Sequence, residues 1–271
     1  MNISLKRIAY IDISFLFLLM LSGFFDGWIQ ELIYYCAFIV PLSLVLFLMR
    51  GDCSKAMLSS LKLSREGLSL TLPLVVPATA SILAIAYLSS LIIPQSENVT
   101  SPDVYGNIFV VILTYALIPA LLEELLFRYV PLVLFSGFER RSVILLTSAA
   151  FAVLHCDLTK LPYAFFAGIV FMVIDFALGS VWPSVIIHAV NNIASILLMR
   201  YGGVSNFTIV FLVVIALAVF ISCAASLFMR RRYIALGGTL SAKMRTAGKV
   251  AQSIEMFLVI GCALLITILN Y

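Results

Sequence analysis

The sequence predicts an all-α protein, a polytopic bundle of about eight or nine transmembrane helices. Of the 271 residues, 63% are hydrophobic and 11% are charged, whereas soluble domains have roughly 45–50% and about 25%. So few charged side chains cannot cover the surface of a soluble protein of this size. The 20 Phe and 11 Tyr residues also exclude an intrinsically disordered chain, which would be poor in aromatic residues.

Each predicted helix is an apolar run that approaches the ~20 residues needed to cross a bilayer. The run that begins at Ser142 is short, and without it the count falls from nine to eight. In chain order, the candidate spans are Ile8–Phe25, Ile29–Met49, Leu68–Ile93, Ile108–Val133, Ser142–Cys156, Leu161–Leu178, Trp182–Met199, Phe207–Phe228 and Ile254–Leu269.

Lysine and arginine residues in the predicted loops orient the chain. With nine spans, every basic cluster falls on one side of the membrane, and cytoplasmic loops are the ones that carry such clusters. We therefore expect a multi-pass protein of the cell membrane with a cytoplasmic N-terminus and an external C-terminus. The net charge of +4 lies in these loop clusters, a pattern that indicates membrane orientation and no nucleic-acid partner. The clusters are Lys6 and Arg7; Arg50, Lys55, Lys62 and Arg65; Arg140 and Arg141; and Arg230, Arg231, Arg232, Lys243, Arg245 and Lys249.

The fourth predicted span carries three ionisable side chains, Glu123, Glu124 and Arg128. An ionisable residue inside a bilayer is costly unless it is paired, so each is a functional candidate. Glu124 and Arg128 are four residues apart and can form an ion pair on one helix face. Glu123 points about 100° away and has no cationic partner on its own helix. The alternative, that the helix ends here at the interface, conflicts with the apolar run from Tyr129 to Phe135.

The protein has two histidines, and both lie in or at the end of an apolar helix. Phe151 and His155 are four residues apart, as are His188 and Asn192, so each pair shares a helix face. At a rise of ~1.5 Å per residue, both histidines and Glu123 fall in the middle third of a ~30 Å core. Helix tilt can absorb the spread in their depths, so we expect them to converge. The alternative is that each histidine is a hydrogen-bonded packing residue.

Three motifs follow one another on these helices: Glu123-Glu124-Leu-Leu-Phe-Arg128, Phe151-Ala-Val-Leu-His155 and His188-Ala-Val-Asn-Asn192. In this order they resemble the CAAX-protease and bacteriocin-processing family (the CPBP or Abi family). That family comprises intramembrane endopeptidases and includes the prenyl-protein endopeptidase that trims isoprenylated CAAX tails. Each motif alone is short, but the three together at membrane depth are specific. The resemblance covers about residues 108–199.

The resemblance implies four catalytic residues. Glu123 would be the general base, and His155 would help to hold and activate a water molecule. His188 and Asn192 would form the oxyanion hole. The chemistry agrees with the last assignment, because an imidazole and an amide on one helix face can both donate to a developing oxyanion.

By the same resemblance, Glu124 and Arg128 would be structural or supporting residues. We expect no cofactor and no metal ligand, although a zinc-dependent version of the protease is the main alternative. Members of the family have been called metalloproteases, and two histidines with a glutamate are a possible zinc set. The HExxH signature is absent, however. Asp175, in the sixth span, either lines the cavity or forms a local cap or pair.

These features predict an intramembrane endopeptidase, a hydrolase that cuts a peptide or protein, lipidated or not, near the cytoplasmic side of the bilayer. The chain is expected to form one membrane domain. Its parts are N-terminal helices in residues 1–107, catalytic core helices in 108–199 and C-terminal helices in 200–271.

Two alternatives belong to other functional classes. In a non-enzymatic bacteriocin-immunity or scaffold protein, the motif residues would only stabilise the bundle. In a proton-coupled transporter, the buried acidic and histidine side chains would form a relay. Matched broken helices in two halves of the chain, which are typical of transporters, are not found in the sequence. The sequence does not identify the substrate.

Overall fold

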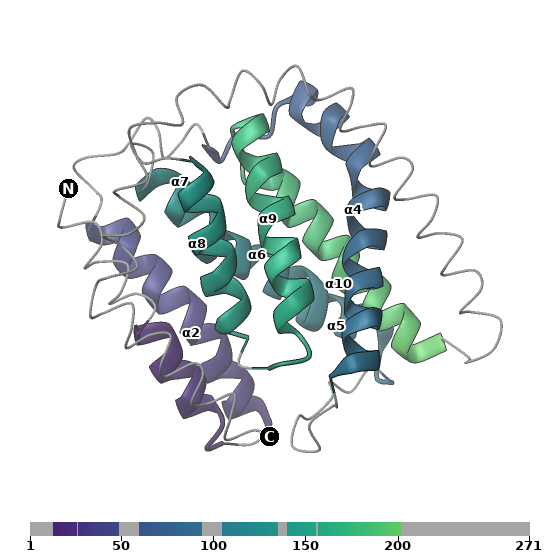
Figure 1. The fold of residues 1–271 in the computed structure, drawn as a ribbon. Helices are drawn as coiled ribbons and strands as arrows, with labels where there is room; N and C mark the ends of the chain where they lie inside the picture. Colours follow the sequence, from purple (N-terminus) through teal and green to yellow (C-terminus); the bar gives the residue numbers. More distant parts are fainter. Residues whose placement is uncertain are drawn as a thin grey trace.

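The computed structural model describes residues 13–25, 27–48, 60–93, 105–134, 140–155 and 157–201. Within these residues every regular element is a helix and there is no strand (Figure 1). The all-α fold class is therefore confirmed, but the count of eight or nine helices is not. The predicted spans Phe207–Phe228 and Ile254–Leu269 lie outside the described residues. Five helices are long and apolar enough to cross a membrane: Gly27–Phe47, Gly67–Ile92, Ile108–Leu132, Leu161–Leu178 and Trp182–Tyr201.

The outer helices present apolar side chains away from the bundle. A short apolar helix at Ile13–Ser22 precedes α2 (Gly27–Leu48), and α4 (Arg65–Ile92) follows. Ser64 caps α4, because its hydroxyl accepts the Gly67 N–H at 2.8 Å. The large side chains exposed on α2 and α4 are almost all apolar, as expected of a surface that faces lipid. They include Trp28, Leu32, Ile39 and Phe47 on α2 and Leu72, Val76, Leu88 and Leu91 on α4.

The predicted fourth span is one continuous helical rod with two π-helical segments. It consists of α5 (Ile108–Ile112), η1 (Leu113–Leu117), α6 (Ile118–Glu124), η2 (Leu125–Tyr129) and α7 (Val130–Leu134). The backbone stays right-handed helical at every junction. Single π-helical turns inside α-helices are frequently found at functional sites. Here they bracket the segment that carries the two glutamates.

Each π segment ends two residues before a proline. In η1 the Ile118 N–H reaches back to the Leu113 carbonyl, and residue 119 is proline, so neither can donate to the Thr114 carbonyl. The Tyr35 hydroxyl of α2 donates to that carbonyl at 3.1 Å. Tyr35 thus supplies a donor that the proline removed from the helix.

The second π segment has the same relation to Pro131. The Val130 N–H reaches back to the Leu125 carbonyl, and Pro131 cannot donate to the Phe127 carbonyl four residues before it. The Arg128 guanidinium donates to this carbonyl through Nη1 at 3.3 Å. The prolines therefore explain both interruptions, and at each one a side chain donates to a carbonyl group left free.

Three further helices complete the described bundle. α8 (Arg140–Val153) and α9 (Leu161–Leu178) form a closely packed pair. A Cβ atom added at Gly168 of α9 would lie 2.8 Å from the Ser148 Cβ of α8, so this approach requires glycine. α9 ends at Gly179, which has a left-handed φ of 66°, and α10 (Trp182–Tyr201) returns across the membrane. Figure 1 shows α9 in the middle of the bundle, between α8 and α4.

A chain of aromatic rings crosses the largest apolar core. Phe15 packs edge-on against Phe38 of α2, with 4.9 Å between ring centroids, and against Phe127, with 5.5 Å. Phe127 in turn packs against Phe151 of α8 at 5.5 Å. All four side chains are buried. The core therefore extends from the N-terminal helices to the Phe-x-x-x-His motif.

Candidate active site

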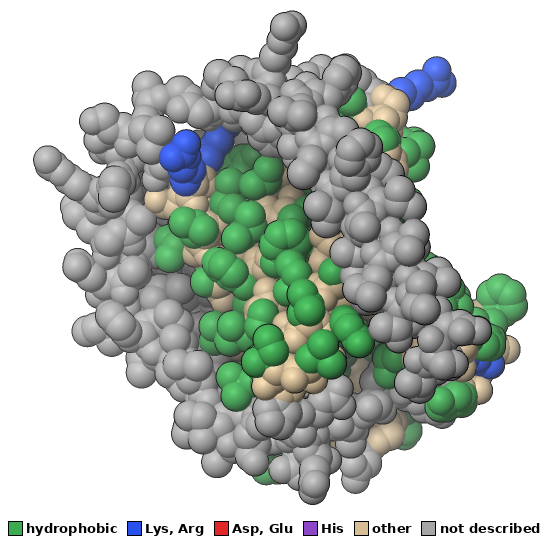
Figure 2. Space-filling model, turned by 45° about the vertical axis from the view of Figure 1, so that its right-hand side comes forward, with side chains coloured by type: hydrophobic (Ala, Val, Ile, Leu, Met, Phe, Trp, Pro, Cys, Tyr) green, Lys and Arg blue, Asp and Glu red, His purple; other side chains and the backbone are tan. Residues whose placement is uncertain are grey.

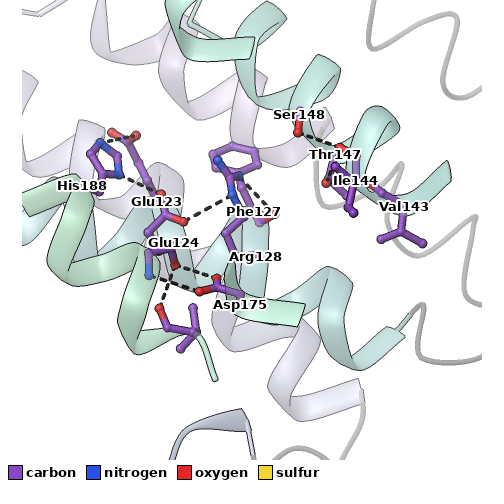
Figure 3. Close-up of polar contacts among 12 residues, drawn as sticks. Glu123, Glu124, Phe127, Arg128, Val143, Ile144, Thr147, Ser148, Asp175 and His188 are labelled. Carbon is purple, nitrogen blue, oxygen red and sulfur yellow. Dashed lines mark hydrogen bonds and ion pairs between the residues drawn. The ribbon is translucent and has the colours of Figure 1, made fainter. Parts of the chain in front are cut away.

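Two adjacent glutamates of α6 face opposite nitrogens of one histidine. His188 of α10 donates through Nδ1 to Glu124 Oε1 at 2.7 Å, and its Nε2 lies 3.8 Å from Glu123 Oε2. The second oxygen of Glu124 lies 3.3 Å from Arg128 Nε. Figure 3 shows both carboxylates directed toward the imidazole. We call Glu123, Glu124, Arg128 and His188 the charge cluster.

The ion pair between Glu124 and Arg128 is completely buried, with 0% of either side chain exposed. The Arg128 guanidinium also lies over the Phe151 ring, 4.2 Å from its centroid, and 5.8 Å from that of Phe171. Removal of one partner of such a buried pair costs about 3–5 kcal/mol, because it leaves a charge without compensation. The predicted ion pair is present in the structure, and its carboxylate also contacts His188.

Phe151 connects the three motifs. Its ring lies beneath Arg128 of the first motif, 4.6 Å from the ring of His155 and 6.2 Å from that of His188. His155 follows the end of α8 and donates through Nδ1 to the Phe151 carbonyl at 2.7 Å, because a carbonyl can only accept. Its Nε2 therefore carries a lone pair. The motifs converge as the sequence predicts, and Phe151 is the residue they share.

The two glutamates have different surroundings. Glu124 is wholly buried and contacts both Arg128 and His188. The Glu123 side chain is 13% exposed, and its buried Oε2 has no hydrogen-bond partner among the described residues. Glu123 therefore keeps lone pairs with which it can accept a proton, whereas the carboxylate of Glu124 is paired with the Arg128 guanidinium and the His188 imidazole.

The asparagine of the third motif is less well defined by contacts. Asn192 lies one turn beyond His188 and is half-buried, and no described residue hydrogen-bonds to its side chain. Its neighbour Asn191 is 8% exposed, and Asn191 Oδ1 is buried without a hydrogen-bond partner among the described residues. Two asparagines next to each other are thus candidates for a donor beside His188.

The donor set around the two histidines does not fit a metal site. Among the described residues, no group of three His, Cys, Asp or Glu side chains is placed to hold a metal ion. Nδ1 of His188 is committed to Glu124, and Nδ1 of His155 to the Phe151 carbonyl. A zinc ion would have to be bound by a rearranged set of side chains.

Three residues around the charge cluster make contacts that the three motifs do not indicate: Phe171, Asp175 and Ser184. Phe171 of α9 stacks on His188 with 5.4 Å between centroids and 28° between planes. Asp175, one turn further along α9, contacts the backbone N–H and the hydroxyl of Ser184 on α10. The signal in the sequence was the short connection through Gly179. A tight turn between two helices brings the last turn of one against the first turn of the next.

Residues 105–194 match the family model of the Rce1-like type II CAAX prenyl endopeptidases. The matched stretch is about a third of the chain and contains all three motifs. Comparisons with curated proteins and with solved structures returned no match. The family indicates a protease, and the apolar helices indicate an integral membrane protein. The predicted resemblance is thereby confirmed: residues 105–194 are similar to the Rce1-like type II CAAX prenyl endopeptidases.

Proposed function

We propose that the protein is an intramembrane endopeptidase of the CPBP type, in which Glu123 and His155 activate a water molecule that hydrolyses a peptide bond. The observation that carries this proposal is the unequal pair of glutamates around His188. One carboxylate is neutralised by Arg128, and the other is free to accept a proton. A protein that needed only a buried ion pair would gain nothing from the second glutamate.

Glu123 is the general base in this mechanism. Its carboxylate is next to an imidazole but is hydrogen-bonded to no described residue. A water molecule beside it can lose a proton to it while the water oxygen attacks the substrate carbonyl. His155 presents the lone pair of Nε2, because Nδ1 is used by the Phe151 carbonyl. That lone pair accepts a hydrogen bond from the same water and orients it.

His188 and Asn192 stabilise the oxyanion in this proposal. Because Nδ1–H of His188 is donated to Glu124, Nε2 can donate to an oxyanion only in the imidazolium form. The charge cluster is electrically balanced in that form, with two carboxylates opposite a guanidinium and an imidazolium. When Glu123 takes the proton from water, its attraction for Nε2–H falls and the imidazolium can donate to the oxyanion instead.

The catalytic cycle is then completed without a further reactant. The C–N bond of the tetrahedral intermediate breaks, and Glu123 returns its proton to the leaving amine. The products are a new carboxylate and a new N-terminus, and the carboxylates and histidines regain their initial states. Neither a metal nor another cofactor is needed for any step of this scheme.

We propose a peptide or protein at the membrane as the substrate, lipidated or not, and cleavage near the cytoplasmic side of the cell membrane. The apolar exterior supports a substrate that reaches the site within the bilayer. The family match supports a CAAX-type substrate, which is a C-terminal tail with a prenylated cysteine.

The decisive experiment compares Glu123→Gln with wild type in lipid nanodiscs on fluorescent peptides with and without a prenylated cysteine. We expect turnover to fall about 10²–10⁴-fold, the contribution of a general base, while the melting temperature stays close to that of wild type. Glu31→Gln is the matched control, because Glu31 is an exposed carboxylate on α2. Full activity of Glu123→Gln would contradict the assignment, and a wild type inactive on every peptide would favour an immunity or scaffold protein.

The same assay tests the metal-free mechanism. We expect EDTA and phenanthroline to leave turnover nearly unchanged, and elemental analysis of the active protein to find no stoichiometric zinc. One zinc per chain, with activity lost on its removal and regained on its return, would replace this mechanism by the zinc-dependent one.

A further inference from the structure

Asp175 is a completely buried carboxyl group that the proposed mechanism does not use. It lies in the last turn of α9 with 0% exposure. Its Oδ1 accepts the backbone N–H of Ser184 at 3.1 Å, and its Oδ2 lies 2.7 Å from the Ser184 hydroxyl. Figure 3 shows it close to Glu124 and on the side of the cluster away from Glu123. A group buried so completely needs a structural or chemical reason.

The contacts of α9 with α10 occur on two successive turns. Asp175 and Phe171 are four residues apart on α9, and Ser184 and His188 are four residues apart on α10. Asp175 binds Ser184, and the Phe171 ring stacks on the imidazole of His188. Two points of attachment one turn apart fix the rotation of α10 about its axis. That rotation decides whether the imidazole lies between the two glutamates.

The hydrogen-bond distances also indicate the protonation state of Asp175. The Ser184 hydroxyl oxygen lies 2.7 Å from Asp175 Oδ2 and 2.7 Å from the Val181 carbonyl oxygen. A serine hydroxyl has one proton and a carbonyl can only accept, so one proton cannot serve both short contacts. Each contact has its own proton if the Ser184 hydroxyl donates to the Val181 carbonyl and the carboxyl group of Asp175 is protonated and donates to the Ser184 hydroxyl.

The charges nearby lead to the same protonation state. The charge cluster already contains two carboxylates opposite one guanidinium and one imidazole. Among the described residues, no basic side chain forms an ion pair with Asp175. An ionised Asp175 would therefore be a third buried carboxylate without a counter-ion, which is strongly unfavourable.

We propose that Asp175 is a positioning residue for His188, and that it acts as an uncharged carboxylic acid hydrogen-bonded to Ser184. Its acid proton is donated to the Ser184 hydroxyl, which donates to the Val181 carbonyl, while Oδ1 accepts the Ser184 N–H. The effect on catalysis rests on the proposed function, but the hydrogen-bond chain does not.

The variants are chosen to separate charge from hydrogen bonding. Asp175→Asn keeps an acceptor for the Ser184 N–H and an N–H₂ donor for the Ser184 hydroxyl, so it reproduces the uncharged acid. Asp175→Ala removes both contacts. Asp157→Asn is the control, since Asp157 lies in the loop before α9 and binds Thr159 and Lys160. Burial works against its charged form, but these two partners outweigh burial and hold the pKa of Asp157 below its ordinary value.

Infrared spectroscopy of the whole protein in nanodiscs reads out the acid directly. We expect wild type to show a carboxylic-acid C=O band that disappears in Asp175→Asn and persists in Asp157→Asn. If Asp175→Asn instead removes a carboxylate band, Asp175 is ionised and this part of the proposal is wrong. The result does not depend on whether the protein cleaves any peptide.

The position of His188 is read out by NMR of nitrogen-labelled histidine, which gives signals from two residues. We expect the His188 signals to be unchanged in Asp175→Asn and Asp157→Asn but shifted or broadened in Asp175→Ala. Turnover should follow the same order. It should fall about 10–100-fold in folded Asp175→Ala, as for a misplaced catalytic group, with KM unchanged, and stay near wild type in Asp175→Asn.

The possible outcomes are distinguishable. Unperturbed His188 signals in folded Asp175→Ala would show that Asp175 does not position the imidazole. Equal damage from Asp175→Asn and Asp175→Ala would show that its charge is what matters. If wild type is inactive on every peptide while the infrared and NMR results are as expected, the proposed function fails and the role of Asp175 stands.

Discussion

Glu123 and Glu124 are identical and adjacent, yet their surroundings give them opposite properties. The carboxylate of Glu124 contacts an arginine and an imidazole, so its charge is compensated by both neighbours. The carboxylate of Glu123 has one contact of 3.8 Å, to Nε2 of the same imidazole. Neighbouring helix positions point about 100° apart, which is why one residue reaches Arg128 and the other does not.

The two asparagines that follow His188 can be separated by single substitutions. Asn192→Ala should lower turnover about 10²–10³-fold, the effect of one lost oxyanion donor. KM should change little, because the interaction is made in the transition state. Asn191→Ala is the matched control and should keep the turnover per folded molecule. It removes an amide whose oxygen has no hydrogen-bond partner among the described residues, so its melting temperature should not fall.

The opposite pattern would also be informative. If Asn191→Ala loses turnover and Asn192→Ala does not, the oxyanion donor is Asn191 and the spacing of the third motif misassigns it. If both variants lose activity only in proportion to their folded fraction, neither asparagine belongs to the site. Kinetics and melting temperatures measured on the same preparations distinguish these cases.

Contacts between two side chains were predicted where the two residues are near each other in sequence. The pair of Glu124 and Arg128 follows from a spacing of four on one helix, and the structure contains it. The contact of Glu124 with His188 joins residues 64 positions apart, and the sequence indicated only that both belong to the site. Helical periodicity fixes which residues share a face but not how two helices are rotated against each other.

The helix that carries Glu123 depends on elements outside itself. Its two π segments, η1 and η2, each precede a proline, Pro119 and Pro131. Around η1 the freed Thr114 carbonyl accepts the Tyr35 hydroxyl of α2. α2 therefore stabilises the shape of the helix that carries Glu123, about two turns before that residue, although none of the motifs lies on α2.

Tyr35→Phe tests this support. We expect a lower melting temperature, because a carbonyl group loses a hydrogen bond of about 1 kcal/mol. Turnover should fall further than the folded fraction, on the order of fivefold, since a relaxed η1 would turn Glu123 away from His188. Tyr201→Phe is the control, as Tyr201 is exposed and contacts Arg200 through its ring. Wild-type turnover in Tyr35→Phe would show that η1 does not need the hydroxyl.

Helix positions followed from the sequence better than helix shapes. The predicted span Leu161–Leu178 coincides with α9, and Trp182–Met199 ends two residues before α10 does. Apolar runs bounded by turn residues are sufficient for that. A proline inside a helix frees a backbone carbonyl, but the hydropathy of Ile108–Val133 contains no sign of a π segment. At η1 the freed carbonyl is satisfied by Tyr35 of another helix, and a single-sequence pattern does not report that contact.

For the molecule as a whole, contacts between loops agree with the predicted alternation of spans. The segment before α4 lies beside the turn between α9 and α10, because the Val181 N–H donates to the Ser60 carbonyl and the Trp182 indole to the Leu61 carbonyl. At the other end, Arg200 donates to the Gly106 carbonyl. In the predicted order of spans, the segment before α4 and the turn between α9 and α10 lie on one side of the membrane. Gly106 and Arg200 lie on the other side, so the observed contacts agree with this order.

The described basic residues are unequally divided between the two sides. Lys62, Arg65, Arg140 and Arg141 belong to the first side, and Lys160 and Arg200 belong to the second. Arg140 lies over the Phe176 ring near the end of α9. Figure 2 shows an apolar face in the middle of the view, with basic side chains at its upper left and at the upper right, and another at the right edge of the molecule. An excess of basic residues marks a cytoplasmic side, and we infer that the first side is the cytoplasmic one.

Cysteine labelling tests this orientation on the full chain. In a variant whose native cysteines are replaced, single cysteines would be introduced by Leu63→Cys or Arg140→Cys on the first side and by Tyr105→Cys or Leu158→Cys on the second. All four positions are exposed. A membrane-impermeant maleimide applied to intact cells should label the second pair, and the first pair only after the cells are opened. The reverse pattern would invert the molecule in the membrane. Labelling of one position from each pair would contradict the alternation of spans itself, which the loop contacts at both ends of the bundle require.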